Sequence, residues 1–84
     1  MKLGVYSLQK VLFQGDATSV NCTTRMGDVT ILDDHEPLIS ILAKGTMTII
    51  DKDEKEWYIP VSSGFLEVNS GSQVKILVEA DDER

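Results

Sequence analysis

The chain contains few residues whose types could support chemistry, and most of them lie in the run Asp33-Asp34-His35-Glu36. Three carboxylates beside an imidazole are donor types that bind a divalent cation or transfer a proton. Adjacent residues rarely converge on one centre, however, and Pro37 fixes the direction in which the chain leaves the run. We therefore interpret the run as a solvated acidic loop, and a metal or small-ligand site there as the alternative.

Nucleophilic catalysis would have to use His35, because it is the only histidine. No serine lies in a Gly-x-Ser-x-Gly turn, since Ser62-Ser63-Gly64 lacks both the spacing and the leading glycine. Cys22 falls on the apolar side of an alternating segment, which predicts a buried and inert thiol. We therefore expect a binding protein without catalytic residues of its own, and an enzyme is the least favoured class.

Other ligand motifs fail on spacing. Asp51-x-Asp53 opens like a calcium loop, but Glu56 occupies the position of the loop's glycine and Ser62 that of its final glutamate. Neither of the glycine-rich phosphate-binding motifs, the P-loop and the dinucleotide fingerprint, occurs. We predict no cofactor and no metal.

The elements that must position these residues are predicted to be β-strands. Val, Ile, Thr and the five aromatic residues supply 26 of the 84 residues, whereas Ala occurs three times. Short alternating segments follow one another at a spacing of roughly 8–12 residues. This pattern predicts an all-β fold, a small β-sandwich or flattened barrel of about eight to ten mostly antiparallel strands. Residues 1–80 would form this single domain, and the acidic tail 81–84 would be frayed.

Several positions within this pattern are assigned in more detail. Residues 14–16 are predicted to form a turn, and residues 38–43 a buried strand, because Pro37 and Gly45 leave room for barely two helical turns. Glycine and proline mark the places where a turn or a close backbone approach is expected. These structural positions are Gly15, Gly27, Pro37, Gly45, Gly64 and Gly71.

Composition narrows the class of partner. The 14 acidic and 8 basic residues give a net charge of −6, which argues against nucleic acid and anionic lipid. A single cysteine allows no internal disulfide and suggests a reducing compartment. No apolar run approaches the ~18 residues that a membrane span needs, so we expect no direct membrane insertion.

Residues 27–38, GDVTILDDHEPL, resemble the motif G-E-[ILV]-x-[IL]-L-P-x-H-x-P-L of the epsilon subunit family of F-type ATP synthases, in its N-terminal β-sandwich domain. Residues 11–17, 44–45, 63–68 and 74–78 resemble further family motifs in the same order. Asp33 departs from the family's proline and Ser63 from the first of its paired glycines. The resemblance covers nearly the whole chain.

The resemblance implies a central-stalk subunit that links the gamma subunit to the membrane c-ring within a hetero-oligomeric complex. It would couple ion translocation to ATP synthesis at the cytoplasmic face of a bacterial inner membrane, or at a plastid equivalent. The sequence is similar to a short form without the C-terminal helical hairpin, so hairpin-based inhibition and ATP binding are not expected. The alternative is a free-standing acidic β-sandwich that binds a ligand or metal at residues 33–36.

Interface positions are expected on two grounds. The resemblance places the loop around His35 at the end of the sandwich that faces the rotor ring, and Asp28 at the family's acidic position. On its own, a lone loop histidine favours a structural role such as capping a backbone carbonyl, and both roles stay open for His35. Apolar residues expected to face outward supply the rest. The predicted interface set is Asp28, Asp34, His35, Glu36, Met47, Ile50 and Tyr58.

Overall fold

The computed structural model describes residues 1–80 as seven β-strands, and this part of the chain contains no helix. The strands are β1 (Lys2–Tyr6), β2 (Val11–Thr24), β3 (Gly27–Leu32), β4 (Leu38–Leu42), β5 (Gly45–Asp51), β6 (Glu56–Asn69) and β7 (Gln73–Ala80). The predicted all-β class is confirmed, whereas the predicted tail 81–84 lies outside the described residues. A helix long and apolar enough to cross a membrane does not occur in residues 1–80.

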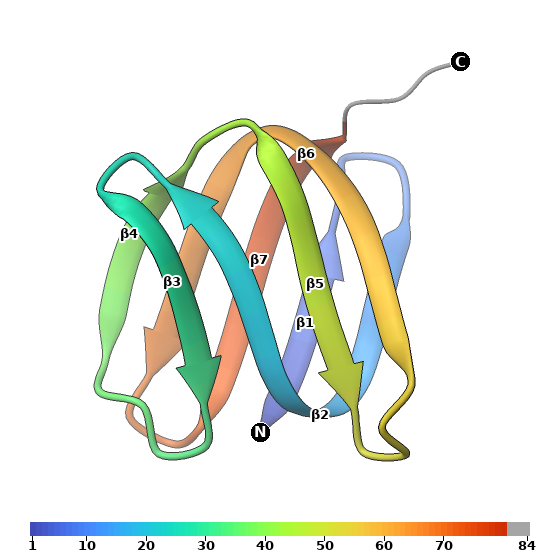
Figure 1. The fold of residues 1–84 in the computed structure, drawn as a ribbon, viewed down its shortest axis with the longest axis vertical. Helices are drawn as coiled ribbons and strands as arrows, with labels where there is room; N and C mark the ends of the chain where they lie inside the picture. Colours follow the sequence, from blue (N-terminus) through green and yellow to red (C-terminus); the bar gives the residue numbers. More distant parts are fainter. Residues whose placement is uncertain (81–84) are drawn as a thin grey trace.

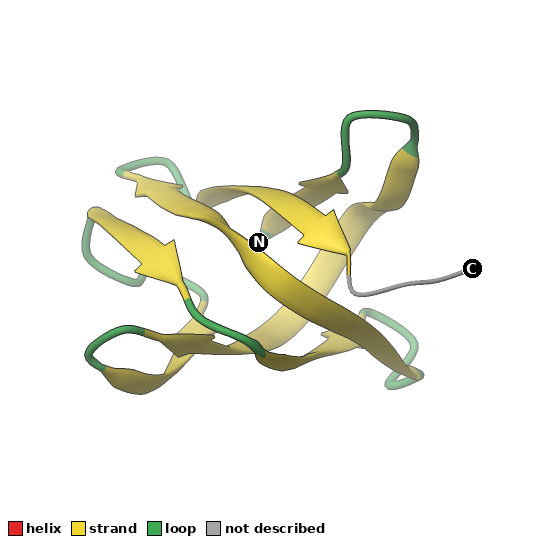
Figure 2. Cartoon of the chain, turned by 90° about the horizontal axis from the view of Figure 1, so that it is seen from above, coloured by secondary structure: helices red, strands yellow, loops and turns green. Residues whose placement is uncertain are grey.

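Two long strands join the two layers of a flattened barrel (Figure 1). The start of β2 pairs with β1 and its later part with β3 and β5, while β6 pairs first with β5 and then with β4 and β7. We call the layer of β3, late β2, β5 and early β6 the β3 layer. The layer of β4, late β6, β7, β1 and early β2 is the β7 layer. All pairings are antiparallel except β1 with β7, and Figure 2 shows the layers from above.

There are fewer strands than expected because β2 and β6 continue through predicted breaks. The turn predicted at residues 14–16 is wrong, since Gly15 lies within β2 and pairs with Leu3. Its φ of 152° is a conformation that side chains with a Cβ rarely adopt, so glycine bends the strand here without ending it. Gly64 likewise lies inside β6, where a Cβ would stand 2.2 Å from the Leu77 carbonyl oxygen.

The core lies between the layers and follows the period of two along each strand. Its largest fully buried side chains include Ile31, Met47, Ile49, Leu66 and Ile76. The outward orientation predicted for Met47 is therefore wrong, because this side chain is only 1% exposed. Met47 shares the inward side of β5 with Ile49, and the residues between and beside them take the outward positions.

The strand predicted at residues 38–43 is confirmed as β4, but it is not buried on both sides. Leu42 is 3% exposed, whereas Ile39 and Ile41 are 76% and 42% exposed. A strand in a two-layer sandwich has one side toward the core, so the apolar residues at its other positions must face outward.

Candidate interaction surfaces

The predicted interface residues do not form one surface. Asp28 lies at the start of β3, and the loop with Asp34, His35 and Glu36 follows its end, so β3 separates them at opposite ends of the sandwich (Figure 1). A strand of this length spans roughly 17–20 Å. Tyr58 lies between the two ends, on the outer side of the β3 layer.

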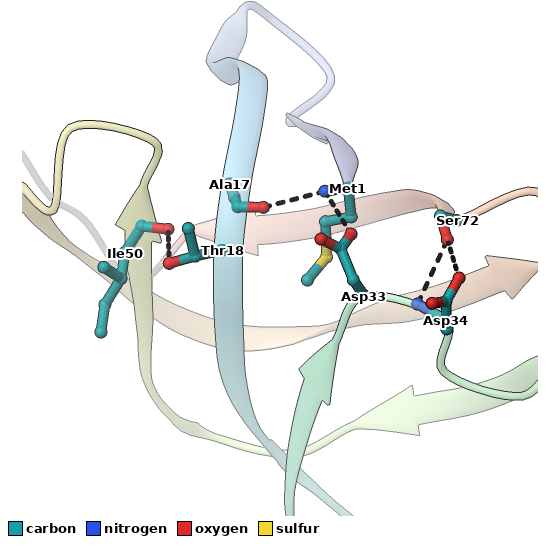
Figure 3. Close-up of polar contacts among 7 residues, drawn as sticks. All are labelled: Met1, Ala17, Thr18, Asp33, Asp34, Ile50 and Ser72. Atoms are coloured by element: carbon teal, nitrogen blue, oxygen red, sulfur yellow. Dashed lines mark hydrogen bonds and ion pairs between the residues drawn. The ribbon is translucent and has the colours of Figure 1, made fainter.

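The acidic loop is held by contacts within the chain (Figure 3). The Met1 α-ammonium lies 2.5 Å from Asp33 Oδ1 and donates to the Ala17 carbonyl at 3.0 Å. The Asp34 backbone N–H donates to Ser72 Oγ at 3.2 Å, and the Ser72 hydroxyl donates to Asp34 Oδ1 at 3.4 Å. These bonds tie the loop to the N-terminal residue, just before β1, and to the β6–β7 turn.

His35 has the geometry of a carbonyl cap. Its Nδ1 lies 2.7 Å from the Glu36 carbonyl oxygen, which can only accept, so Nδ1 carries the proton in this contact. Its backbone N–H donates to the Leu32 carbonyl at 3.2 Å. In residues 1–80, no three His, Cys, Asp or Glu side chains come close enough together to hold a metal ion. The contact of Nδ1 with the Glu36 carbonyl is the observation that favours the structural role of His35.

Asp51 organises the β5–β6 hairpin. Its Oδ1 accepts the backbone N–H groups of Asp53 and Lys55 at 2.8 and 2.9 Å, and its Oδ2 accepts the indole N–H of Trp57 at 3.0 Å. The bond from Trp57 is the main reason that the pKa of Asp51 lies below its ordinary value. The Lys55 ammonium also lies 4.8 Å from the centroid of the Trp57 ring. This carboxylate therefore caps a turn.

Cys22 is buried, as predicted from its place in an alternating segment. Burial raises the pKa of its thiol to about 12, because the thiolate would lose its hydration. A thiol in this environment is a core residue rather than a nucleophile.

The outer side of the β3 layer is largely polar. Asn21 Nδ2 donates to Thr30 Oγ1 at 2.9 Å, and Asn21 pairs with Thr48 on the next strand. Tyr58, beside Thr48, is 62% exposed, so its predicted outward orientation is confirmed. Its hydroxyl donates to the Glu56 carboxylate, and this bond raises the pKa of Tyr58.

Ile50, also predicted to face outward, is half-buried on the β3 layer, and its carbonyl accepts the Thr18 hydroxyl at 3.2 Å (Figure 3). It lies beside Glu56, in a row of residues separate from that of Tyr58. The outer side of this layer therefore exposes isolated apolar groups among polar ones.

A larger apolar group lies on the outer side of the β7 layer, and the sequence-based prediction missed it. Cross-strand pairing places five residues side by side on β4, β6, β7, β1 and β2. We call them the apolar row: Ile41, Phe65, Leu77, Tyr6 and Val11. The sequence signal for this group is a run of consecutive apolar residues, such as ILV at 76–78. A sandwich strand has only one side in the core, so the middle residue of such a run must face outward.

Residues 1–81 match the family described as ATP synthase, Delta/Epsilon chain, beta-sandwich domain. The chain belongs to this family. Its membership confirms the resemblance that the sequence motifs indicated, and the β-sandwich named for the family agrees with the two layers described above.

Curated relatives of this delta/epsilon-chain domain are named ATP synthase epsilon chain. The relative from Bordetella avium is 39% identical over 72 residues, which cover 86% of this chain and 51% of the relative. The relative from Corynebacterium glutamicum is 37% identical over 76 residues, which cover 89% of this chain and 59% of the relative. The chain therefore spans about half the length of the curated relatives it matches.

Solved structures share the delta/epsilon fold at lower identity. A chain of the Euglena gracilis mitochondrial ATP synthase, solved as OSCP/F1/c-ring, superposes with a TM-score of 0.85 at 23% identity, covering 90% of this chain and 48% of that chain. A chain of the Tetrahymena thermophila mitochondrial ATP synthase central stalk/c-ring superposes with a TM-score of 0.82 at 14% identity, covering 93% of this chain and 62% of that chain.

Proposed function

We propose that this delta/epsilon-family domain is a rotor subunit of an F-type ATP synthase, which links the gamma subunit of the central stalk to the membrane c-ring. The observation that carries the proposal is the match of residues 1–81 to the family, together with relatives named ATP synthase epsilon chain. The domain would lie at the cytoplasmic face of a bacterial inner membrane, held there by its partners within the complex.

The proposed mechanism is mechanical. Hydrogen bonds join the loops at one end of the sandwich to each other, as Asp34 is joined to Ser72. These bonds would help the sandwich to keep its shape while it transmits torque. Asp51 and His35 bond to groups of their own turn and loop, which supports structural roles for both side chains. We propose no catalytic residue in this domain. Neither ATP binding nor inhibition is assigned to this sandwich. Its part is to couple ion translocation to ATP synthesis.

Asp28 and the loop around His35 receive different roles. Their positions at opposite ends of β3 mean that a flat ring surface can contact one end only. We assign the ring contact to the end with Asp28, an exposed residue next to the β2–β3 turn. This assignment replaces the expectation that the loop around His35 faces the ring. His35 then acts mainly as the carbonyl cap of its loop.

Co-expression with the gamma subunit of the same organism tests this function. The chain should co-purify with that subunit as a one-to-one complex and melt at a higher temperature than it does alone, because a partner that binds only the folded state stabilises it by mass action. Native mass spectrometry gives the stoichiometry. Purified proteins that do not associate at tens of micromolar would contradict the assignment.

Asp28→Lys separates interface from fold in the same assembly. Asp28 is exposed in β3 and makes only one exposed side-chain hydrogen bond, from Thr23 Oγ1 at 3.2 Å, so charge reversal should change the folding free energy by no more than about 0.5 kcal/mol. In membranes that carry the assembled enzyme, however, it should reduce ATP-driven proton pumping. Normal pumping with Asp28→Lys would contradict the ring contact.

A further inference from the structure

Asp28, the residue assigned to the ring contact, is held by a side chain of the neighbouring strand. Thr23 and Asp28 lie directly opposite each other in the register of β2 and β3. The Thr23 hydroxyl donates to Asp28 Oδ1 at 3.2 Å. Within residues 1–80 this is the one hydrogen bond of the Asp28 side chain, so its second oxygen, Oδ2, is left to accept from a donor outside the chain.

Gly45, the first residue of β5, leaves the space that the Thr23 side chain occupies. The β2–β3 turn and the connection from β4 to β5 lie at the same end of the sandwich (Figure 1), and there the Ala43 N–H donates to the Thr23 carbonyl at 2.9 Å. A Cβ at Gly45 would stand 2.6 Å from Thr23 Oγ1 and 3.0 Å from Thr23 Cβ. Any side chain at position 45 would therefore displace the hydroxyl that holds Asp28.

A second threonine fixes the backbone just before Asp28. The buried Thr24 hydroxyl donates to the Gly27 carbonyl at 2.7 Å and accepts the Met26 N–H at 3.1 Å. The turn is thus held by bonds within the chain, whatever the Asp28 side chain does. The direction of the Asp28 carboxylate depends on the separate bond from Thr23.

We propose that Thr23 is a positioning residue for the ring contact, because its hydroxyl holds the Asp28 carboxylate in the orientation in which it meets the c-ring. The inference rests on the proposed function, which assigns the ring contact to Asp28. An exposed side chain that is already held in one orientation loses less conformational entropy when it binds. With Oδ1 bonded to Thr23, Oδ2 accepts from a hydrogen-bond donor on the ring.

A purely structural role for this bond would be to hold β2 to β3. These strands are already joined along their register, from the Ser19–Leu32 pair to the Thr24–Gly27 pair. The bond from Thr23 to Asp28 is exposed, and an exposed hydrogen bond competes with bonds to water. Its loss should therefore change folding little, so experiment can separate the two roles.

Addition of purified variants to inverted membrane vesicles from cells of the source organism that lack this chain tests the proposal. The quantity measured is the half-restoring concentration, at which the added chain restores half of the ATP-driven proton pumping. Thr23→Val removes the hydroxyl at similar volume and should raise this concentration roughly 3- to 10-fold, the effect of one hydrogen bond. Thr23→Ser keeps the hydroxyl and should match the unmodified chain. Gly45→Ala should raise the concentration at least as far as Thr23→Val.

Thr18→Val is the matched control. Its hydroxyl also donates an exposed hydrogen bond from β2, to the Ile50 carbonyl at 3.2 Å, but toward the other end of the β3 layer (Figure 3). Thr18→Val should match the unmodified chain in restoring pumping. Binding of Thr23→Val to the purified gamma subunit, measured without the ring, should weaken less than about threefold. A folding defect would weaken that binding as much as it weakens restoration.

Asp28→Ala shows whether Thr23 acts through Asp28. In the Asp28→Ala background, Thr23→Val should cause no further rise in the half-restoring concentration. If Asp28→Ala alone matches the unmodified chain, the ring contact in the proposed function fails and this inference with it.

The inference alone is overturned if Asp28→Ala is impaired but Thr23→Val is not. It is also overturned if Thr23→Val causes its full rise in the Asp28→Ala background, or weakens binding to the gamma subunit as much as restoration. Melting temperatures show which variants fold. If Gly45→Ala does not fold, Thr23→Val and its combination with Asp28→Ala still decide the outcome.

Discussion

Single polar residues in this domain act mainly on its own backbone. Asp51 accepts three hydrogen bonds, His35 lies against the carbonyl of its neighbour, and Asp34 exchanges bonds with Ser72. The sequence favoured a solvated loop at Asp34 and a structural role for His35, but it left a metal or ligand site open as the alternative, because a carboxylate that caps a turn and one that binds a metal have the same residue type. The partner atom decides between the roles, and only the fold provides it.

The Cys22 thiol should be unreactive in the folded protein. Reaction requires the thiolate, and a pKa of about 12 with a buried side chain leaves almost none near pH 8. We expect no labelling by a thiol-specific disulfide reagent within minutes, and complete labelling after addition of denaturant. Stoichiometric labelling without denaturant would show that the strand opens or that the side chain is not buried.

Asp51 should stabilise the domain in a pH-dependent way. Its pKa is lowered in the folded state, so its contribution is present above the ordinary value of 3.8 and is lost as the pH falls through the folded value. Asp51→Asn should lower the melting temperature near pH 7, because an amide has one acceptor oxygen, so its N–H₂ would face either the indole N–H of Trp57 or the backbone N–H groups of Asp53 and Lys55. The difference between the two proteins should shrink toward about pH 2. A difference that does not depend on pH would contradict this role of the carboxylate.

At the scale of elements, alternation predicted the all-β class but not the continuity of the strands. Gly15 and Gly64 were expected to mark turns, and both lie inside strands that bend from one layer to the other. A glycine that ends a strand and one that bends it occur in similar sequences, and only the pairing partners distinguish them. The inward side of β5 was misjudged at Met47. The period of two in the sequence places Met47 and Ile49 on the same side of the strand, but it does not by itself show which side faces the core.

Gly64→Ala should destabilise the sandwich by about 1–3 kcal/mol or more, because the new methyl group would meet backbone atoms that cannot rotate away. The nearest are the Leu77 carbonyl oxygen at 2.2 Å and Val78 Cα at 3.1 Å. Gly71→Ala is the matched control, since its Cβ would approach nothing closer than Asn69 Oδ1 at 3.7 Å. Thermal melting should show a fall of at least about 4 °C for Gly64→Ala alone. Equal melting temperatures for the two variants would contradict the close approach of β6 and β7.

Glu54→Gly should stabilise the β5–β6 hairpin. Glu54 has a φ of 65°, and its N–H donates to the Asp51 carbonyl at 3.0 Å, so it occupies the left-handed position at which hairpin loops favour glycine. Relief of this conformation, less the added chain entropy of glycine, should raise stability by about 0.5–1 kcal/mol. Glu54→Gln keeps the strain and removes the same charge. If both variants gain equally, charge and not conformation is the cause.

At the scale of the whole molecule, the two broad sides differ in chemistry. The β3 layer presents threonine and asparagine side chains that bond to one another, whereas the β7 layer presents the apolar row. Composition could not predict this difference, because an outward leucine and a core leucine count alike. Motif spacing nevertheless predicted the family, since its glycines and the histidine loop lie at the ends and bends of strands.

The proposed function is that this domain couples the c-ring to the central stalk without catalysis. The most direct measurement is ATP-driven proton pumping in inverted membrane vesicles from cells of the source organism that lack this chain, before and after the purified chain is added back. We predict that ATP hydrolysis persists without the chain, that pumping is lost, and that addition restores pumping to the native level. Pumping that is undiminished in vesicles without the chain would contradict the proposed function.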